Sequence, residues 1–175
     1  QFPKEKLTMA VNSEALEERL NNIKEVLSKG ELPSSSIIKF FCPWYESNII
    51  SEGSVDLIIS QAVLEHVEDL DNTYKAMNLW LKKGGVISHQ IDFKSHNLSK
   101  YSNGHWSYTD YEWKLIKGTE LYLINREPLS THIELLKKHG FTVIKVDSVK
   151  EYPKNIYEGR ITREMLSDKF QDISD

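Results

Sequence analysis

The chain has 175 residues, 22 basic and 26 acidic side chains, a net charge of −4 and one cysteine. This length predicts a single domain, and the acidic balance argues against binding nucleic acid through bulk positive charge. One cysteine excludes an internal disulfide, and the lack of a membrane-spanning apolar run or a signal peptide predicts a cytoplasmic protein without membrane contact.

The first predicted element is a helix that begins at Ser13, a good N-cap, and ends before Gly30. Its apolar side chains recur at helical spacing, at Leu16, Leu20, Ile23 and Leu27. Two buried strands are predicted next, at residues 37–41 and 55–59, because each is a short apolar run.

The rest of the chain continues the alternation of helices and strands. In chain order we predict a helix at 69–83 ended by Gly84 and Gly85, a strand at 86–91, a polar, aromatic-rich excursion at 97–111, a short helix at 110–116, a helix at 128–139, a strand at 141–149 and a short polar helix at 162–170. This order predicts an α/β fold with a mostly parallel sheet, whose ligands bind at the carboxyl ends of the strands.

Two groups of polar residues follow predicted strands. In the first group Gln61, Glu65 and His66 either face a ligand or are solvated. The second group is His89, Asp92 and His96. Two histidines and a carboxylate are suited to acid–base catalysis, to metal binding with His66 as a further ligand, or to structural hydrogen bonds. Period-two geometry places Ser88 and Gln90 on one face of the strand and His89 and Ile91 on the other.

Two later segments are also candidates for binding. Asn125 and Arg126 precede a helix, where the arginine either pairs with a substrate carboxylate or phosphate or bridges locally. His105 and Trp106 lie in the aromatic excursion, which is either a lid over a pocket or an ordinary satellite cluster.

Two stretches of the chain resemble the second half of a class I S-adenosylmethionine-dependent methyltransferase. They are residues 53–69, which contain Leu64-Glu65-His66-Val67, and residues 81–89, which contain Lys82-Lys83-Gly84-Gly85. The resemblance extends over residues 15–149. It implies an incomplete Rossmann-like three-layer sandwich, with a mostly parallel sheet and helices on both faces. It also implies methyl transfer from S-adenosylmethionine to a small-molecule or sugar-type acceptor.

The same resemblance implies roles for particular residues. The cofactor is expected at Trp44, Tyr45, Ser60, Gln61, Ala62 and Glu65. Residues near the reaction centre, including the base, are expected among His66, His89, Asp92 and His96. Acceptor contacts are expected at Asn125, Arg126, His105 and Trp106, and no metal is assigned.

None of the eight glycines forms the glycine-rich loop that follows the first strand in this family. We therefore expect residues 1–175 to be a truncated domain that lacks the first two strands. Alone, it is expected to be inactive and to bind the cofactor weakly or not at all. Its open sheet edge is suited to a homodimer. The alternatives are a non-catalytic methyltransferase-like binding module, or a metal-binding protein that uses His89, Asp92 and His96.

Overall fold

The computed structural model describes residues 13–29, 39, 41, 49–149 and 154–173. The chain divides into two compact units, residues 1–49 and 50–175, and each is described by itself. In the first unit α2 (Ser13–Ser28) confirms the first predicted helix. Apart from residues 39 and 41, the strand predicted at 37–41 lies outside the described residues.

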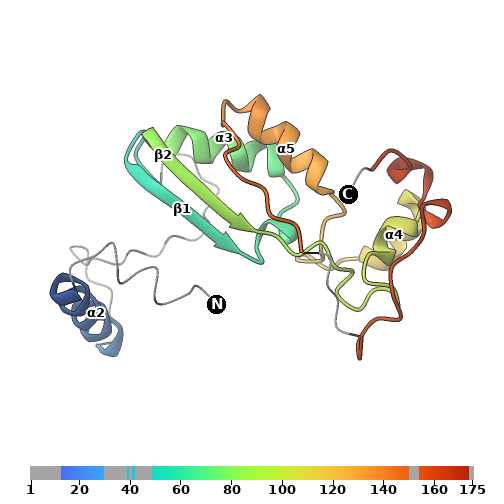
Figure 1. Ribbon diagram of the computed structural model, residues 1–175, viewed down its shortest axis with the longest axis horizontal. Helices are drawn as coiled ribbons and strands as arrows, with labels where there is room; N and C mark the ends of the chain where they lie inside the picture. Colours follow the sequence, from blue (N-terminus) through green and yellow to red (C-terminus); the bar gives the residue numbers. More distant parts are fainter. Residues whose placement is uncertain (1–12, 30–38, 40, 42–48, 150–153, 174–175) are drawn as a thin grey trace. The chain divides into compact units, whose positions relative to one another are not determined.

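The second unit is built on two parallel strands, β1 (Val55–Gln61) and β2 (Leu81–Gln90). They are joined by the single 3-10 turn η1 (Leu64–His66) and the helix α3 (Leu70–Trp80) (Figure 1). Parallel neighbours need such a crossover, so the predicted α/β class is confirmed. The register aligns the carboxyl ends of the strands, with Ser60 opposite His89.

The boundary between α3 and β2 differs from the prediction, which continued the helix to Lys83. The helix ends at Trp80, and Leu81 is already extended and paired with Val55 of β1. The ladder is then irregular until Val86, with Gly84 at a φ of 83°, which favours glycine. Pairing with β1 thus overrides a helical pattern that continued in the sequence.

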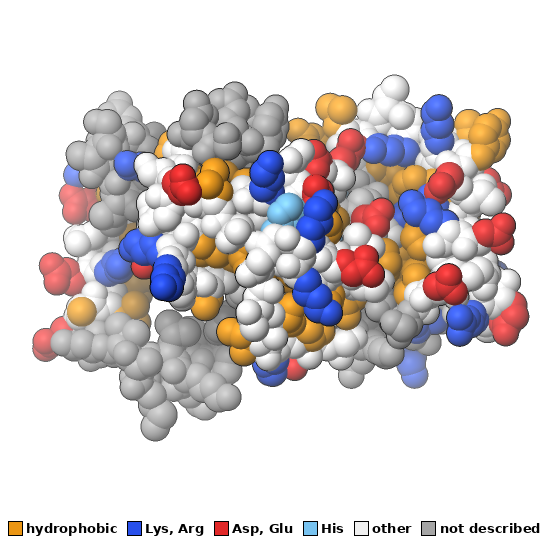
Figure 2. Space-filling model, turned by 90° about the horizontal axis from the view of Figure 1, so that it is seen from above, with side chains coloured by type: hydrophobic (Ala, Val, Ile, Leu, Met, Phe, Trp, Pro, Cys, Tyr) orange, Lys and Arg blue, Asp and Glu red, His pale blue; other side chains and the backbone are white. Residues whose placement is uncertain are grey.

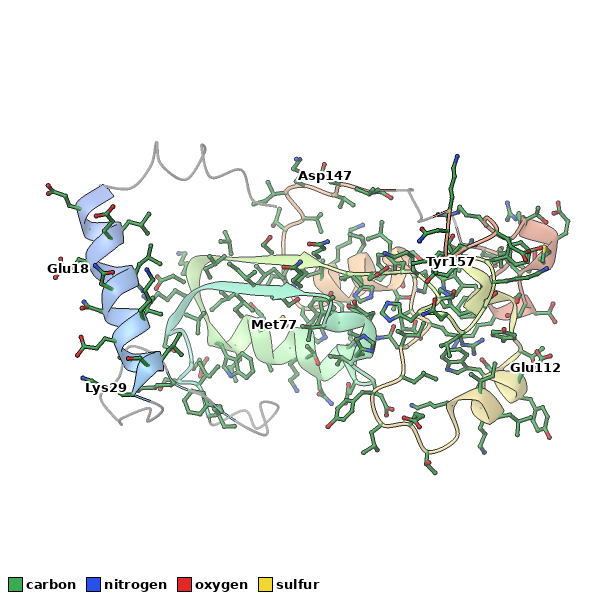
Figure 3. The ribbon with its side chains drawn as sticks, turned by 90° about the horizontal axis from the view of Figure 1, so that it is seen from below. Glu18, Lys29, Met77, Glu112, Asp147 and Tyr157 are labelled. Atoms are coloured by element: carbon green, nitrogen blue, oxygen red, sulfur yellow. The ribbon has the colours of Figure 1, made fainter. Side chains whose placement is uncertain are left out.

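One face of the strand pair carries the core. Burial alternates along β2, with Ile87 and His89 half-buried and Ser88 exposed, which confirms that His89 and Ser88 lie on opposite faces of the strand. Ile87 of β2 and Leu135 and Leu136 of α5 (Leu129–Lys138) pack against the same buried cluster, and α3 and α5 lie on the same side of the strands (Figure 1). The buried centre of this core is Leu64, Leu70, Tyr74 and Met77 (Met77 is labelled in Figure 3). The described residues thus supply the sheet and one helical layer.

The predicted strand at 141–149 is absent, because these residues form no ladder with any strand that the structure describes. Phe141 hydrogen-bonds back to Leu136 and packs on the core, but Ile144 is 86% exposed. Alternating apolar residues predict a strand only if a neighbour pairs with them.

A second, smaller core lies in the aromatic excursion and the C-terminal segment. Trp106 of η2 (Gly104–Ser107) packs with Ile161 and Phe170. The helix α4 (Asp110–Lys117) begins at a capping box formed by Thr109 and Glu112, which confirms the short helix predicted there.

The predicted helix at 162–170 is wrong. The segment forms two 3-10 turns, η3 (Arg163–Met165) and η4 (Asp168–Phe170), because Leu166 between them is extended.

On the face that Figure 2 shows, basic and acidic side chains are interspersed over the described surface. None of the helices described here is long and apolar enough to cross a bilayer.

Candidate functional site

Two groups of side chains with histidines lie at or just after the carboxyl ends of β1 and β2. The Glu65 group consists of Glu65, His66 and His96. The His89 group consists of Ser60, Tyr74, His89 and His132. The sequence predicted that ligands bind at the carboxyl ends of the strands. In the structure, the polar side chains near these ends fall into the two groups.

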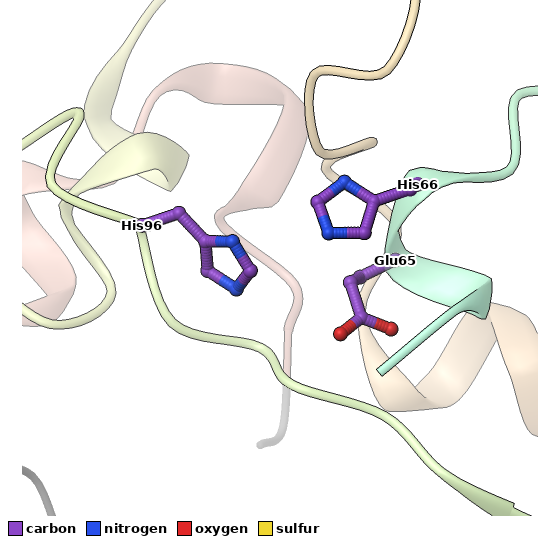
Figure 4. A group of neighbouring side chains, drawn as sticks. All are labelled: Glu65, His66 and His96. Carbon is purple, nitrogen blue, oxygen red and sulfur yellow. The ribbon is translucent and has the colours of Figure 1, made fainter. Parts of the chain in front are cut away.

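The Glu65 group joins two segments that are about 30 residues apart in the sequence. Glu65 and His66 come from η1, and His96 comes from the loop after β2 (Figure 4). One ligand-type atom from each residue lies within 4.8 Å of those from the other two. The His66 and His96 rings meet edge to face with their centroids 5.3 Å apart. The three side chains therefore point into one space.

Glu65 is the unusual member, because it is only 3% exposed. Both of its carboxylate oxygens are buried without a hydrogen-bond partner among the described residues. A buried carboxylate is normally paired, hydrogen-bonded or bound to a metal, because it loses its hydration. No described residue therefore supplies the hydrogen bond or positive charge that the Glu65 side chain would need as a partner.

The turn that carries the group is held from behind by Asn125. Its side-chain amide donates to the carbonyls of Leu64 and Val67, 2.7 and 2.8 Å away, and its backbone N–H donates to the Glu65 carbonyl. His66 Nδ1 lies 2.8 Å from the Tyr122 carbonyl. A carbonyl only accepts, so Nδ1 carries the proton and Nε2 has the lone pair.

Asp92 lies beside this group. Its Oδ2 is 3.5 Å from His96 Nε2 and 2.9 Å from Lys94 Nζ. Burial alone would raise the pKa of Asp92, but hydrogen bonds from Lys94 and the charges of Lys94 and His96 outweigh it and lower that pKa. Asp92 is therefore a carboxylate near neutral pH, already paired with a cation.

The backbone around the group contains the three non-glycine residues in the left-handed region that the described chain shows. They are Ala62, His96 and Asn97, with φ of 51°, 48° and 66°. Such conformations cost of order 1 kcal/mol or more each and cluster at functional sites. Ala62 is held there by a hydrogen bond from its N–H to the Gln90 carbonyl, across the ends of the two strands.

The His89 group is packed and hydrogen-bonded. His89 Nδ1 lies 2.7 Å from Ser60 Oγ, which is its partner in the strand register. His132 Nδ1 lies 2.9 Å from the buried Tyr74 hydroxyl, and the Tyr74 ring meets both imidazoles edge to face. Burial lowers the pKa of His89, and burial together with the charge of His89 lowers that of His132 to about 4. Both rings are therefore neutral at physiological pH.

Arg126, one of the residues expected to bind the acceptor, is engaged locally. Its guanidinium pairs with Asp110 and donates to the Tyr108 carbonyl, and it lies 5.0 Å from the ring centroids of Trp113 and Phe170. These are the contacts of the local bridge that the sequence left open.

His105 and Trp106 are also buried, at 2% and 4% exposure. Trp106 Nε1 donates to the Arg126 carbonyl, so the excursion packs as a satellite cluster. Burial, followed by the charges of Arg126 and His96, lowers the pKa of His105 to about 3. His105 is therefore neutral beside the Glu65 group.

The residues expected at the cofactor are placed only in part. Trp44 and Tyr45 lie outside the described residues. Gln61 and Ala62 form an exposed turn at the end of β1, whereas Glu65 faces inward. Sequence reasoning missed Tyr74, Tyr122 and His132, because no spacing along the chain links them to the histidines that they contact.

We compared the chain with known proteins. A family model described as a methyltransferase domain matches residues 7–148, well over half of the chain. Comparisons with curated proteins and with solved structures found no match. The parallel strands, the crossover helix and the polar carboxyl edge agree with that model. The chain therefore belongs to the family of methyltransferase domains, of the class I S-adenosylmethionine-dependent type.

Proposed function

We propose that the chain takes part in methyl transfer from S-adenosylmethionine to an oxygen or nitrogen atom of a small-molecule or sugar-type acceptor. The observation that supports this most is the concentration of histidines and carboxylates at the carboxyl edge of β1 and β2 in a methyltransferase domain. In parallel α/β sheets this edge is where ligands bind.

The described residues fit one end of such a cofactor. The turn at Gln61 and Ala62 is exposed and polar, and its left-handed backbone is fixed by the bond to Gln90. We place the methionine end of the cofactor against this turn. When bound, S-adenosylmethionine supplies an electrophilic methyl group.

His89 is our choice for the base that takes the acceptor's proton. Its pKa is lowered by burial, so the ring is neutral and able to accept a proton. In the tautomer in which Nδ1–H donates to Ser60 Oγ, Nε2 carries the lone pair, and Nε2 has no hydrogen-bond partner among the described residues. Ser60 then orients the ring.

The test begins with cofactor binding. Isothermal titration with S-adenosylmethionine and S-adenosylhomocysteine is done on the 175-residue chain and on the longest protein that its gene encodes. We expect the chain alone to bind weakly or not at all, because its sequence lacks the glycine-rich loop. Micromolar binding by the chain alone would contradict that expectation.

Activity is then tested with isotopically labelled S-adenosylmethionine and a panel of hydroxylated and amino acceptors, including sugars. His89→Gln is expected to lower kcat by about 10²- to 10⁴-fold with cofactor affinity unchanged. If the longest encoded protein binds neither form of the cofactor, the chain is a non-catalytic binding module. That alternative rests on the absent glycine-rich loop.

A further inference from the structure

We infer that Glu65, His66 and His96 form a binding site for one divalent first-row transition metal ion, with zinc preferred. The inference rests on the geometry of these side chains, and it does not depend on the proposed methyl transfer. It differs from the metal set considered from the sequence, because His89 faces Ser60 and Tyr74 instead.

The first argument is the donor set. Two imidazoles and one carboxylate suit zinc and its first-row neighbours, whereas magnesium and calcium prefer oxygen ligands. Three protein ligands of this composition are the set that holds zinc in sites with one open position. The fourth position is then available to water.

The second argument is the state of Glu65. Its side chain is buried, and neither oxygen has a hydrogen-bond partner in the part of the chain described. A cation bound here would be the partner that both buried oxygens lack. Hydrogen bonding to the neighbouring histidines does not do so in this structure.

The third argument is geometric. The ligand atoms lie within 4.8 Å of one another, and tetrahedral zinc with bonds of about 2.0 Å needs about 3.3 Å between them. The separations between the ligand atoms therefore have to shrink by at most about 1.5 Å, which small movements of the three side chains share. Figure 4 shows all three directed into the same space from two segments.

The fourth argument is the support behind the ligands. The Tyr122 carbonyl fixes the His66 tautomer that leaves Nε2 unprotonated, which is the usual arrangement for a histidine ligand. Asn125 fixes the turn that carries both Glu65 and His66. Asp92, paired with Lys94, places a carboxylate oxygen 3.5 Å from His96 Nε2 and so limits the positions open to that ring.

The test measures metal binding by the 175-residue chain without cofactor or acceptor, so its failure is separate from failure of the proposed function. After removal of metal with a chelator, the chain is titrated with Zn²⁺ by calorimetry, with Co²⁺ by visible absorption and with Mg²⁺. We expect one Zn²⁺ per chain at micromolar affinity or better, Co²⁺ bands of low coordination number, and much weaker Mg²⁺ binding.

Glu65→Gln and His96→Gln are each expected to weaken Zn²⁺ binding by at least about 100-fold. The matched control is His139→Gln, since His139 pairs with Asp71 and belongs to neither group. Zn²⁺ should raise the Tm of the wild type and the control but not of the two ligand variants. Because Glu65→Gln keeps the size and shape of the buried side chain, we expect it to fold.

Three results would overturn the inference. They are a wild-type chain that binds neither Zn²⁺ nor Co²⁺, a preference for Mg²⁺ over Zn²⁺, and ligand variants that bind Zn²⁺ as tightly as the His139→Gln control.

Discussion

The Glu65 group and the His89 group contain the same kind of residue at the same edge of the sheet, but their surroundings differ. In the His89 group, each imidazole has a hydroxyl partner at Nδ1, Ser60 for one and Tyr74 for the other, while Nε2 of both rings is buried without a partner among the described residues. In the Glu65 group, the carboxylate is buried with neither oxygen paired. The first surroundings keep two imidazoles neutral, whereas imidazoles beside a carboxylate without a partner are suited to binding a cation.

The largest effect on stability should come from Leu64, a buried core residue that neighbours Glu65 and lies in the same cluster as Tyr74. Leu64 is 1% exposed, precedes Glu65 in the turn and packs with Tyr74 in the main core. Leu64→Ala is expected to lower the free energy of unfolding by about 3 kcal/mol through lost contacts and the cavity left behind. Urea unfolding measures this, with Leu79→Ala on the exposed side of α3 as the control. An equal loss of unfolding free energy in the two variants would contradict the packing of Leu64 in the core between the groups.

Acidification should distinguish the groups next. The folded-state pKa of His132 is about 4, below its ordinary value of 6.5, so the unfolded chain binds a proton more readily. The contribution of His132 is therefore fully present above about pH 6.5 and is lost as the pH falls toward 4. The loss amounts to about 3 kcal/mol at most.

Unfolding free energies measured between pH 4 and 7 test this loss. His132→Gln should show a shallower pH dependence than the wild type, and His139→Gln should not. If the curves of the wild type and His132→Gln are parallel, His132 is not buried in its neutral form.

Asn125→Ala should act on the Glu65 group alone. It removes the two side-chain bonds to Leu64 and Val67, and we expect a loss of about 2 kcal/mol in the free energy of unfolding. Zn²⁺ affinity should fall as well, because the turn that positions Glu65 is released. Asn78→Ala, at an exposed position of α3, is the control for both measurements. An unchanged Zn²⁺ affinity would contradict the role of Asn125 in positioning the turn.

The smallest effect should come from Ser60→Ala, which removes one partly buried hydrogen bond to His89. We expect a loss of about 1 kcal/mol and unchanged Zn²⁺ affinity, since Ser60 belongs to the other group. Ser88→Ala, at an exposed position of β2, controls for serine loss in a strand. A clear fall in Zn²⁺ affinity would show that the groups are coupled.

Much of the local structure followed from the sequence. The spacing of apolar residues and the capping residues predicted α2 and α5, and the apolar run at 55–59 predicted β1. Period-two alternation put His89 on the opposite face of β2 from Ser88 and Gln90. These features depend on neighbours within a turn or a strand, so the sequence by itself determined them.

Only the tertiary structure decided which polar side chains meet. Residues 141–149 have the alternation of a strand but no partner in the described chain, and β2 begins at Leu81 because Val55 pairs with it. His96 reaches His66 across about 30 residues, while His89, nearer in sequence to His96, turns to Ser60. Long-range contacts of this kind follow from chain topology and packing, which no local spacing encodes.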